Sequence, residues 1–500
     1  MKTRISVRTN EHNSISMKTV AVDIKRSTSM KISLLIWRGV ATVASLALLS
    51  IAAMGQGTLK NSGVFRNTGT VTYKEVQNYR NATNGTILNS GTLNTTTAGG
   101  GSGNFLNTDG AARAGTVKNY IGGTGSGTIA VATNINNNFA GCAIDNDSTA
   151  GFSTIKVAGA VNNTGGTFTT TRGRVVYNGS GAQAVLATTY GTLVTDVGGS
   201  KTLAATTTVN DSLRVDNTST LAISTFQLNL TGATNVAQNS GVFSANAGTV
   251  QYDGDRDQTM IAAQYKTLTL SGSTSAHTKT SPGGLSFAAS GALTVSANDT
   301  LYVSSGNLDL STNSPSLTNS SAIKVAGNAT FQAGITNAGT FYYAGTSTQT
   351  IGAVTYANLR LGASGAKTFP NGTVAVTGNY TIDVGAGARD YTTNTNTFQF
   401  AGTTGTQTVS NLSETFYVVQ FSGAALKSLA GTSFGASRMD LLTGTGQVTN
   451  SVTTVTLTNI TNVSLTIAAA TELVNTATIN LNGDIQNDGF LTNSGTIAVY

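Results

Sequence analysis

The chain has 500 residues, of which 10% are charged and 39% are hydrophobic, with 58 glycines and three prolines. So low a charged fraction, against roughly 25% in ordinary soluble domains, together with the scarcity of proline, argues against both conventional globular domains and a solvated disordered polymer. Residues 1–55 contribute +6 of the formal charge of +7; the remaining +1 is spread without a basic stripe, so nucleic acid is excluded as an expected partner.

Residues 1–55 have the pattern of a signal peptide with an extended N-terminus. Met30 and Met17 are both candidates for the true start; from Met30, a lysine is followed by an apolar stretch and then by the small residues Ala53 and Gly55. This order predicts cleavage after Gly55. The apolar run is too short for a membrane anchor, and no later segment is apolar enough to span a bilayer as a helix. We therefore expect a mature chain without a transmembrane segment, exported by a Gram-negative bacterium to its surface or secreted.

The region 56–165 repeats a short phrase of the form apolar–x–Asn–x–Gly–x–apolar, as at 59–65, 65–71 and 87–93. Asparagine and glycine tolerate positive φ and close tight turns, so each phrase predicts a strand, a turn and a second strand. The only cysteine, Cys142, excludes an intrachain disulfide and is expected to be a small buried residue.

The region 166–445 contains four copies of a longer repeat, at 175–203, 250–280, 341–369 and 398–429. Each copy holds an aromatic residue, a glycine turn, a glutamine, a second aromatic residue, leucines and a lysine. Strands recur about every eight residues, and no stretch has a helical period. Such repetition predicts one supersecondary unit stacked on copies of itself.

The conserved positions of the repeat predict an internal role. The first aromatic residue alternates with aliphatic residues on one face of its strand, so we expect the aromatic pairs to stack inside the coils, while the glutamines and lysines organise turns. The aromatic pairs are Tyr177/Tyr190, Tyr252/Tyr265, Tyr343/Tyr356 and Phe400/Phe416. The polar residues are Gln183, Gln258, Gln349 and Gln407, with Lys201, Lys279, Lys367 and Lys427.

One turn of the second copy carries three alternating carboxylates, Asp253, Asp255 and Asp257. Calcium prefers several oxygen ligands, so these residues are the candidate metal site, and calcium is the only cofactor suggested; decoration of a polar turn is the alternative. His277 is the only histidine after the leader. With no carboxylate or second histidine nearby in the sequence, it is expected to be a surface turn residue, and no catalytic site is predicted.

The region 446–500 continues the strand pattern and ends in another copy of the short phrase, at 493–500. We expect further solenoid strands with no cap. Open strand edges at such an end would allow self-association.

The phrases at 257–270 and 347–369 are similar to repeats of large secreted bacterial surface proteins, the adhesin-like β-solenoids of the filamentous-haemagglutinin and autotransporter-passenger kind. The resemblance covers most of 57–500, and it transfers no catalytic residues. Together with the alternation of the strands, it implies an all-β, elongated β-solenoid built from irregular repeats, and it favours a parallel β-helix.

These observations predict an exported structural or adhesive cell-surface protein without catalytic activity. Its long wall of Thr, Ser and Asn would bind glycans, extracellular matrix or other cells through many weak hydrogen bonds. Two alternatives stay open: a β-helix enzyme acting on polysaccharide, for which only Asp253–Asp257 could begin a site, and a passive spacer that carries a missing domain.

Overall fold

The computed structural model describes residues 57–61, 64–80, 83–84, 86–98, 102–107, 116–119, 127–138, 140, 142–147, 153–232 and 235–500. Within these ranges the chain is all β, without a helix, and forms a parallel β-solenoid of about 19 turns. The predicted fold is confirmed. The described ranges contain no helix that is long and apolar enough to cross a membrane. The expected leader, residues 1–55, lies outside them, and the region boundaries near 165 and 445 stay predictions.

Short strands dominate the first coils: β1 (Thr58–Lys60), β2 (Val64–Asn67), β3 (Thr70–Tyr73), β4 (Glu75–Gln77), β5 (Tyr79–Arg80), β6 (Thr83–Asn84), β7 (Thr86–Asn89), β8 (Thr92–Thr95), β9 (Phe105–Leu106), β10 (Thr116–Lys118), β11 (Thr128–Val131), β12 (Ile135–Asn136), β13 (Ala143–Asp145), β14 (Thr154–Val157) and β15 (Val161–Asn162). The middle coils contain β16 (Thr167–Tyr177), β17 (Gln183–Val185), β18 (Thr189–Thr195), β19 (Ser200–Leu203), β20 (Thr207–Asp216), β21 (Thr220–Ala222), β22 (Gln227–Leu230), β23 (Asn235–Asn239), β24 (Val242–Tyr252), β25 (Gln258–Thr259), β26 (Gln264–Leu270), β27 (His277–Ser281), β28 (Ser286–Val295), β29 (Asp299–Val303), β30 (Leu308–Leu310), β31 (Ser316–Asn319), β32 (Ala322–Val325) and β33 (Ala329–Phe331). The later coils contain β34 (Thr336–Tyr343), β35 (Gln349–Thr350), β36 (Thr355–Leu361), β37 (Lys367–Thr368), β38 (Thr373–Val376), β39 (Tyr380–Ile382), β40 (Arg389–Asp390), β41 (Thr397–Phe400), β42 (Thr406–Phe421), β43 (Leu426–Leu441), β44 (Val448–Asn450), β45 (Thr454–Ile467), β46 (Glu472–Asn475), β47 (Thr478–Asn487), β48 (Phe490–Asn493) and β49 (Thr496–Val499).

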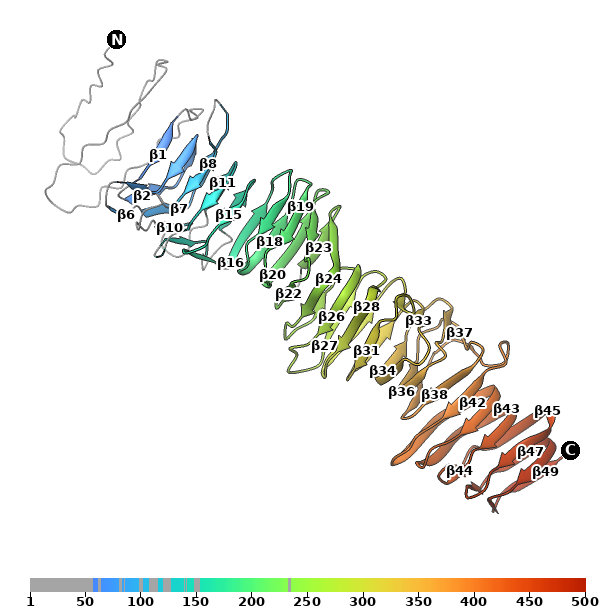
Figure 1. The fold of residues 1–500 in the computed structure, drawn as a ribbon. Coiled ribbons are helices and arrows are strands. Elements are labelled where there is room, and N and C mark those ends of the chain that lie inside the picture. The colour runs from blue at the N-terminus through green and yellow to red at the C-terminus, as the bar shows by residue number, and fades with distance from the viewer. Residues whose placement is uncertain are drawn as a thin grey trace, which may run out of the picture. The chain divides into compact units, whose positions relative to one another are not determined.

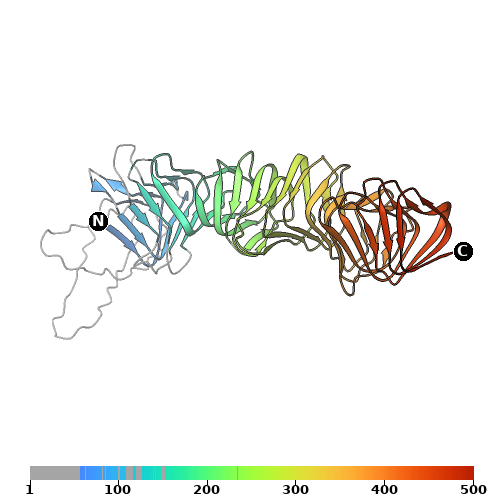
Figure 2. The same ribbon diagram turned by 90° about the horizontal axis from the view of Figure 1, so that it is seen from below.

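Strands pair in parallel with the corresponding strands of the coils before and after them. In β16, for example, Val175 pairs with Ile155 of β14 on one side and with Leu193 of β18 on the other. Among the described strands, β5 and β6 form the single antiparallel pair. The coils of the solenoid therefore follow one another in chain order, from the blue to the red strands of Figures 1 and 2.

Alternation along each strand divides the chain into a core and an outer wall. In β32, Ile323 and Val325 are fully buried, whereas Ala322 and Lys324 between and beside them are half-buried on the outer face. This is the period of two that an extended strand imposes. The inward side chains of successive coils form one continuous apolar core. Cys142 is buried as expected, with its thiol 3.0 Å from the carbonyl oxygen of Asn107.

Two ladders of asparagines, all buried except Asn163, support the first coils. In each ladder the side-chain amide of one coil donates to the side-chain oxygen of the next, at 2.7–2.9 Å. Shorter ladders recur further along the chain. The members are Asn61, Asn78, Asn107, Asn137 and Asn163 in the first ladder, Asn67, Asn89, Asn119 and Asn146 in the second, and Asn319 with Asn337 and Asn450 with Asn475 and Asn493 later.

The ladders show that the Asn-x-Gly phrase has a different physical cause from the positive φ that was predicted. Strand, turn and strand occur as predicted, for instance in β7 and β8, but Asn67, Asn89 and Gly91 are not among the residues with positive φ. The asparagine is required because its amide stacks along the corner. Glycine follows because a Cβ atom at Gly91 would lie 2.0 Å from the carbonyl oxygen of Gly69 in the preceding coil. The phrase therefore marks close packing between coils and not a left-handed turn.

Candidate functional site

The aromatic pairs of the long repeat lie inside the solenoid, as predicted. In the first copy, the hydroxyls of Tyr177 and Tyr190 are 3.0 Å apart, and both side chains are fully buried. The backbone N–H of Leu186 donates to the Tyr177 hydroxyl, and the Tyr190 hydroxyl donates to the carbonyl of Leu186. The pair therefore satisfies both backbone groups of a residue at a bend, which a buried backbone requires. The Tyr252/Tyr265 and Tyr343/Tyr356 pairs repeat this arrangement.

The fourth copy explains why phenylalanine is tolerated there. Phe400 and Phe416 replace the tyrosines, and the bend is replaced by the 16-residue strand β42. Because most of β42 pairs with β43, the backbone needs no side-chain hydroxyls at this place.

The glutamine and lysine of each copy organise the glycine turns, as predicted, but they do so from the core. Gln183 accepts from the N–H of Gly179 at 2.8 Å and donates to the carbonyl of Val157 at 3.0 Å. The ammonium of Lys201 donates to the carbonyls of Gly179 and Gly198, both at 2.6 Å. The equivalent lysines are also buried. Burial lowers the pKa of all four, that of Lys427 to about 8. These conserved polar groups are structural and face away from solvent.

Two of the three carboxylates predicted to bind calcium accept hydrogen bonds from different neighbours. Asp255 accepts hydrogen bonds from the backbone and hydroxyl of Thr274, which lower its pKa, and Asp257 accepts one from the N–H of Thr278. Burial raises the pKa of Asp253, one of whose oxygens is buried without a hydrogen-bond partner in the structure. No group of three or more His, Cys, Asp or Glu side chains in the described ranges is arranged to hold a metal ion. The calcium site therefore stays a prediction without support from this arrangement.

The structure brings His277 into contact with two of these carboxylates. Its Nε2 lies 3.3 Å from Asp255 and its Nδ1 lies 3.5 Å from Asp257, one coil earlier. His277 was predicted to be a surface turn residue, and the structure places it at the start of β27, where residues about 20 positions apart meet because the coils stack. The Ser275 hydroxyl is 3.1 Å from the same Nε2 that faces Asp255. The Asp255 carboxylate and the Ser275 hydroxyl compete for this nitrogen. The arrangement of His277 therefore fits a link between two turns better than a base that activates Ser275 as a nucleophile.

A second cluster, which sequence reasoning missed, lies on the outer wall of β29, β32, β34 and β36. Tyr302 pairs in register with Lys324, Lys324 with Tyr342, and Tyr342 with Arg360. These four residues and Asp383, which follows β39, are called the outer stripe below. The signal was present in the alternation, since each of the four lies between two inward-facing residues.

Within the outer stripe, aromatic rings and cations alternate from coil to coil. The Lys324 ammonium lies 4.3 Å from the centroid of the Tyr302 ring and 5.5 Å from that of Tyr342, and the Arg360 guanidinium lies 4.5 Å from the Tyr342 centroid. Arg360 also donates to Asp383 at 2.8 Å, and the Tyr342 hydroxyl donates to the same carboxylate at 2.7 Å. Burial by itself raises the pKa of Asp383. The hydrogen bonds from Arg360 and Tyr342 outweigh this effect, so the pKa is lowered. Half-exposed cation–π contacts contribute about 0.5–1 kcal/mol each.

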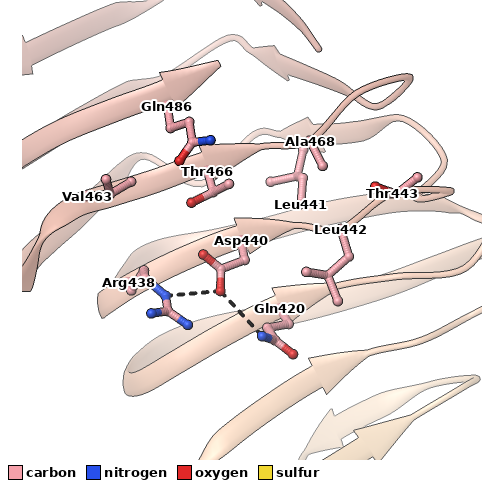
Figure 3. Close-up of a pocket in the computed structure, with 10 residues that line it drawn as sticks. All are labelled: Gln420, Arg438, Asp440, Leu441, Leu442, Thr443, Val463, Thr466, Ala468 and Gln486. Atoms are coloured by element: carbon pink, nitrogen blue, oxygen red, sulfur yellow. Dashed lines mark hydrogen bonds and ion pairs between the residues drawn. The ribbon is translucent and has the colours of Figure 1, made fainter. Parts of the chain in front are cut away.

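A polar hollow of about 610 Å³ lies on the wall of the last coils (Figure 3). Gln420, Asp440, Thr466 and Gln486 line it in register, one from each of β42, β43, β45 and β47. Arg438 donates to Asp440 at 3.0 Å, so the two charges compensate each other. The amides of Gln420 and Gln486 also donate to carboxylates, those of Asp440 at 3.4 Å and Asp488 at 3.0 Å.

Comparison of the chain with protein-family models, with curated proteins and with solved structures found no match. The likeness to adhesin-like repeats therefore rests on the repeat pattern and the solenoid fold alone.

Proposed function

We propose that this protein is an exported structural or adhesive protein of the bacterial surface that binds glycans along the outer wall of its solenoid. The observation that carries the proposal is a double column of polar side chains on consecutive parallel strands. One column contains Gln227, Thr249, Thr267 and Ser316, interrupted by Ala292, and the other contains Asn229, Gln251, Thr269, Thr294 and Thr318.

The chemistry of this array suits sugars. Hydroxyl and amide groups donate and accept hydrogen bonds, as sugar hydroxyls do. Parallel strands lie about 4.7–4.9 Å apart, close to the length of one sugar residue in an extended glycan, so a chain along the solenoid axis meets similar groups at each coil. Each contact is weak, about 0.5–1.5 kcal/mol, and affinity comes from their repetition.

The array is held ready for a ligand by bonds between its own members. Gln227 donates to Gln251 of the next coil at 2.7 Å, and Gln251 donates to the Ser271 hydroxyl at 2.9 Å. Side chains ordered in this way lose less conformational freedom on binding, which favours recognition of an extended ligand.

The proposal is tested by measuring binding of the purified protein to an array of polysaccharides and to matrix proteins. We expect saturable glycan binding that falls about tenfold in the double variant Thr267→Val and Thr269→Val, which replaces two hydroxyls by methyl groups of similar size. Thr456→Val with Thr458→Val, the same pair of changes on distant outward positions of β45, is the matched control and should bind as wild type.

Other results would favour the alternatives. A passive spacer would bind nothing on either array. Release of shorter glycans from the bound polysaccharide would show an enzyme.

A further inference from the structure

The outer stripe contains the same spatial arrangement twice, once complete and once with a residue replaced. In the complete half, Tyr342, Arg360 and Asp383 occupy three successive coils. Two coils earlier, the register places Tyr302, Lys324 and Ala344 in the corresponding positions. Ala344 follows Tyr343 at the end of β34 as Asp383 follows Ile382 at the end of β39, and each bonds through its N–H to the preceding coil. Alanine therefore stands where the other half has a carboxylate.

The complete half shows what a carboxylate does at this place. Asp383 accepts from Arg360 at 2.8 and 3.2 Å and from the Tyr342 hydroxyl at 2.7 Å. Gly362 lies between them, and a Cβ atom there would be 2.4 Å from the Tyr342 hydroxyl. The tyrosine reaches the carboxylate because the intervening coil has no side chain.

In the other half, the corresponding cation has no anion. The Lys324 ammonium contacts the rings of Tyr302 and Tyr342, and no carboxylate or hydrogen-bond acceptor within the described ranges touches it. Ala326 replaces Gly362, so we expect its methyl group to keep the Tyr302 hydroxyl away from the wall and toward solvent. Both polar groups of this half are thus available to a ligand from outside.

We propose that Tyr302 and Lys324 bind an external carboxylate at the place above Ala344, and that the ligand is an acidic polysaccharide of uronic acid residues. The carboxylate is inferred from Asp383, which shows the anion this arrangement holds. A column of hydroxyl and amide side chains, interrupted by Ala322 in the coil of Lys324, lies beside the stripe and supplies partners for the sugar hydroxyls. Its members are Thr278, Thr300, Thr340 and Asn358. The proposal rests on the glycan-binding function proposed above and names its ligand class at this wall.

The test measures binding of oligogalacturonate, and of a neutral oligosaccharide of equal length, to the full chain by calorimetry at low ionic strength. Wild type is expected to bind the uronate saturably, and Lys324→Gln to weaken it about tenfold through loss of a charge-assisted hydrogen bond. Ala344→Asp is expected to abolish uronate binding, because it supplies an internal carboxylate like Asp383. Lys156→Gln is the matched control, since Lys156 is also the outward residue of an Ile-Lys-Val strand but has no aromatic neighbour in register; it should change affinity less than twofold.

Several outcomes would overturn the inference. Equal losses in Lys324→Gln and Lys156→Gln would indicate binding by overall charge. Displacement of the oligomer by free galacturonate or inorganic phosphate at equal molar concentration would indicate a simple anion site. Binding of neutral glycans without uronates would reject this ligand and leave the proposed function intact, whereas absence of all glycan binding would reject both. Thermal unfolding confirms that the variants fold; if Ala344→Asp does not, Tyr302→Ala replaces it, with an expected loss of affinity.

Discussion

Turns between parallel strands leave backbone carbonyls that point into a space closed to water. In this protein, four buried lysines meet that need by placing an ammonium among the carbonyls of glycine turns, such as Gly179, Gly181 and Gly198 around Lys201. The ammonium has three donors and can satisfy several carbonyls at once. The cost is the desolvation of a charge, which lowers the pKa of these lysines.

This cost predicts that the protein becomes more stable as the pH rises above about 8. The pKa of Lys427 is lowered to about 8 in the folded chain, whereas an unfolded lysine keeps a pKa of about 10.4. Between these values the unfolded state binds more protons, so the free energy of unfolding increases with pH. In Lys427→Met this increase should be smaller in denaturant unfolding, while Lys156→Met, on the exposed wall, should keep it. Identical pH profiles of Lys427→Met and wild type would contradict the assignment.

The buried tyrosines predict a specific loss of stability on removal of one hydroxyl. Tyr343→Phe leaves the N–H of Gly352 without its acceptor and removes the bond between Tyr343 and Tyr356. An unsatisfied buried donor costs about 1–3 kcal/mol, so unfolding should occur at lower denaturant. Tyr302→Phe, which removes a hydroxyl from the outer wall, should unfold like wild type. If both variants are equally stable, the hydroxyl pair does not support the bend.

At the scale of the strand, neighbouring coils are held together mainly by side chains of the same kind that stack from one coil to the next. Asparagine ladders hold corners in the first coils, and aromatic rings fill the core of the later ones, where Phe398 contacts Phe369, Phe400 and Phe416 at centroid distances of 5.0–5.7 Å. Such pairs contribute about 0.5–1.5 kcal/mol beyond their burial. Each ladder fixes the register of its strands, because a slip by one residue would turn the amide outward.

Interruption of a ladder should therefore loosen the coils on both sides of it. Asn119→Ala removes the acceptor of the Asn89 amide and the donor to Asn146, both buried. We expect a loss of about 1–3 kcal/mol and faster amide hydrogen exchange in β7, β10 and β13 than in the last coils. Asn162→Ala, at an exposed asparagine that bonds to Asn136, should change stability by less than about 0.5 kcal/mol. Uniform exchange along the whole chain of Asn119→Ala would argue against a local role.

At the scale of the molecule, each coil contacts mainly the coils on either side of it. Stability of such a stack is approximately a sum over coils and their interfaces. Coil length varies, since ladder residues of neighbouring coils are 17 to 30 positions apart, yet the strands stay in register.

We expect the protein to tolerate deletion of one whole coil but not deletion of half a coil. Val455 pairs with Ile479 of the next coil, so deletion of residues 455–478 joins Thr454 to Ile479 and keeps the inward face inward. We expect the unfolding temperature to change by only a few degrees. Deletion of residues 455–466 should lower it strongly or prevent folding, because neighbouring strands lose their partners. Equal tolerance of the two deletions, measured by thermal circular dichroism, would contradict a stack of discrete coils.

The sequence by itself determined the class of fold, the strand and turn of each phrase, and the internal place of Tyr177, Tyr252 and Tyr343. Alternation with period two and the repetition of a phrase are local properties, so they can be read without knowing which coils are neighbours. The prediction that the repeat glutamines and lysines organise turns also depended only on their own segment of the sequence. What the sequence did not reveal is that the lysines are buried, since lysine normally remains solvated.

Only the tertiary structure decided which residues meet between coils. His277 and Asp255, Tyr302 and Lys324, and the asparagines of each ladder lie one coil apart, and the coils differ in length. A fixed spacing in the sequence therefore cannot identify these contacts; they depend on strand register, which is set by packing of the whole stack. The outer stripe, and the position above Ala344 that has no carboxylate, could be found only in the structure. Their residues come from five coils and not from one segment of the chain.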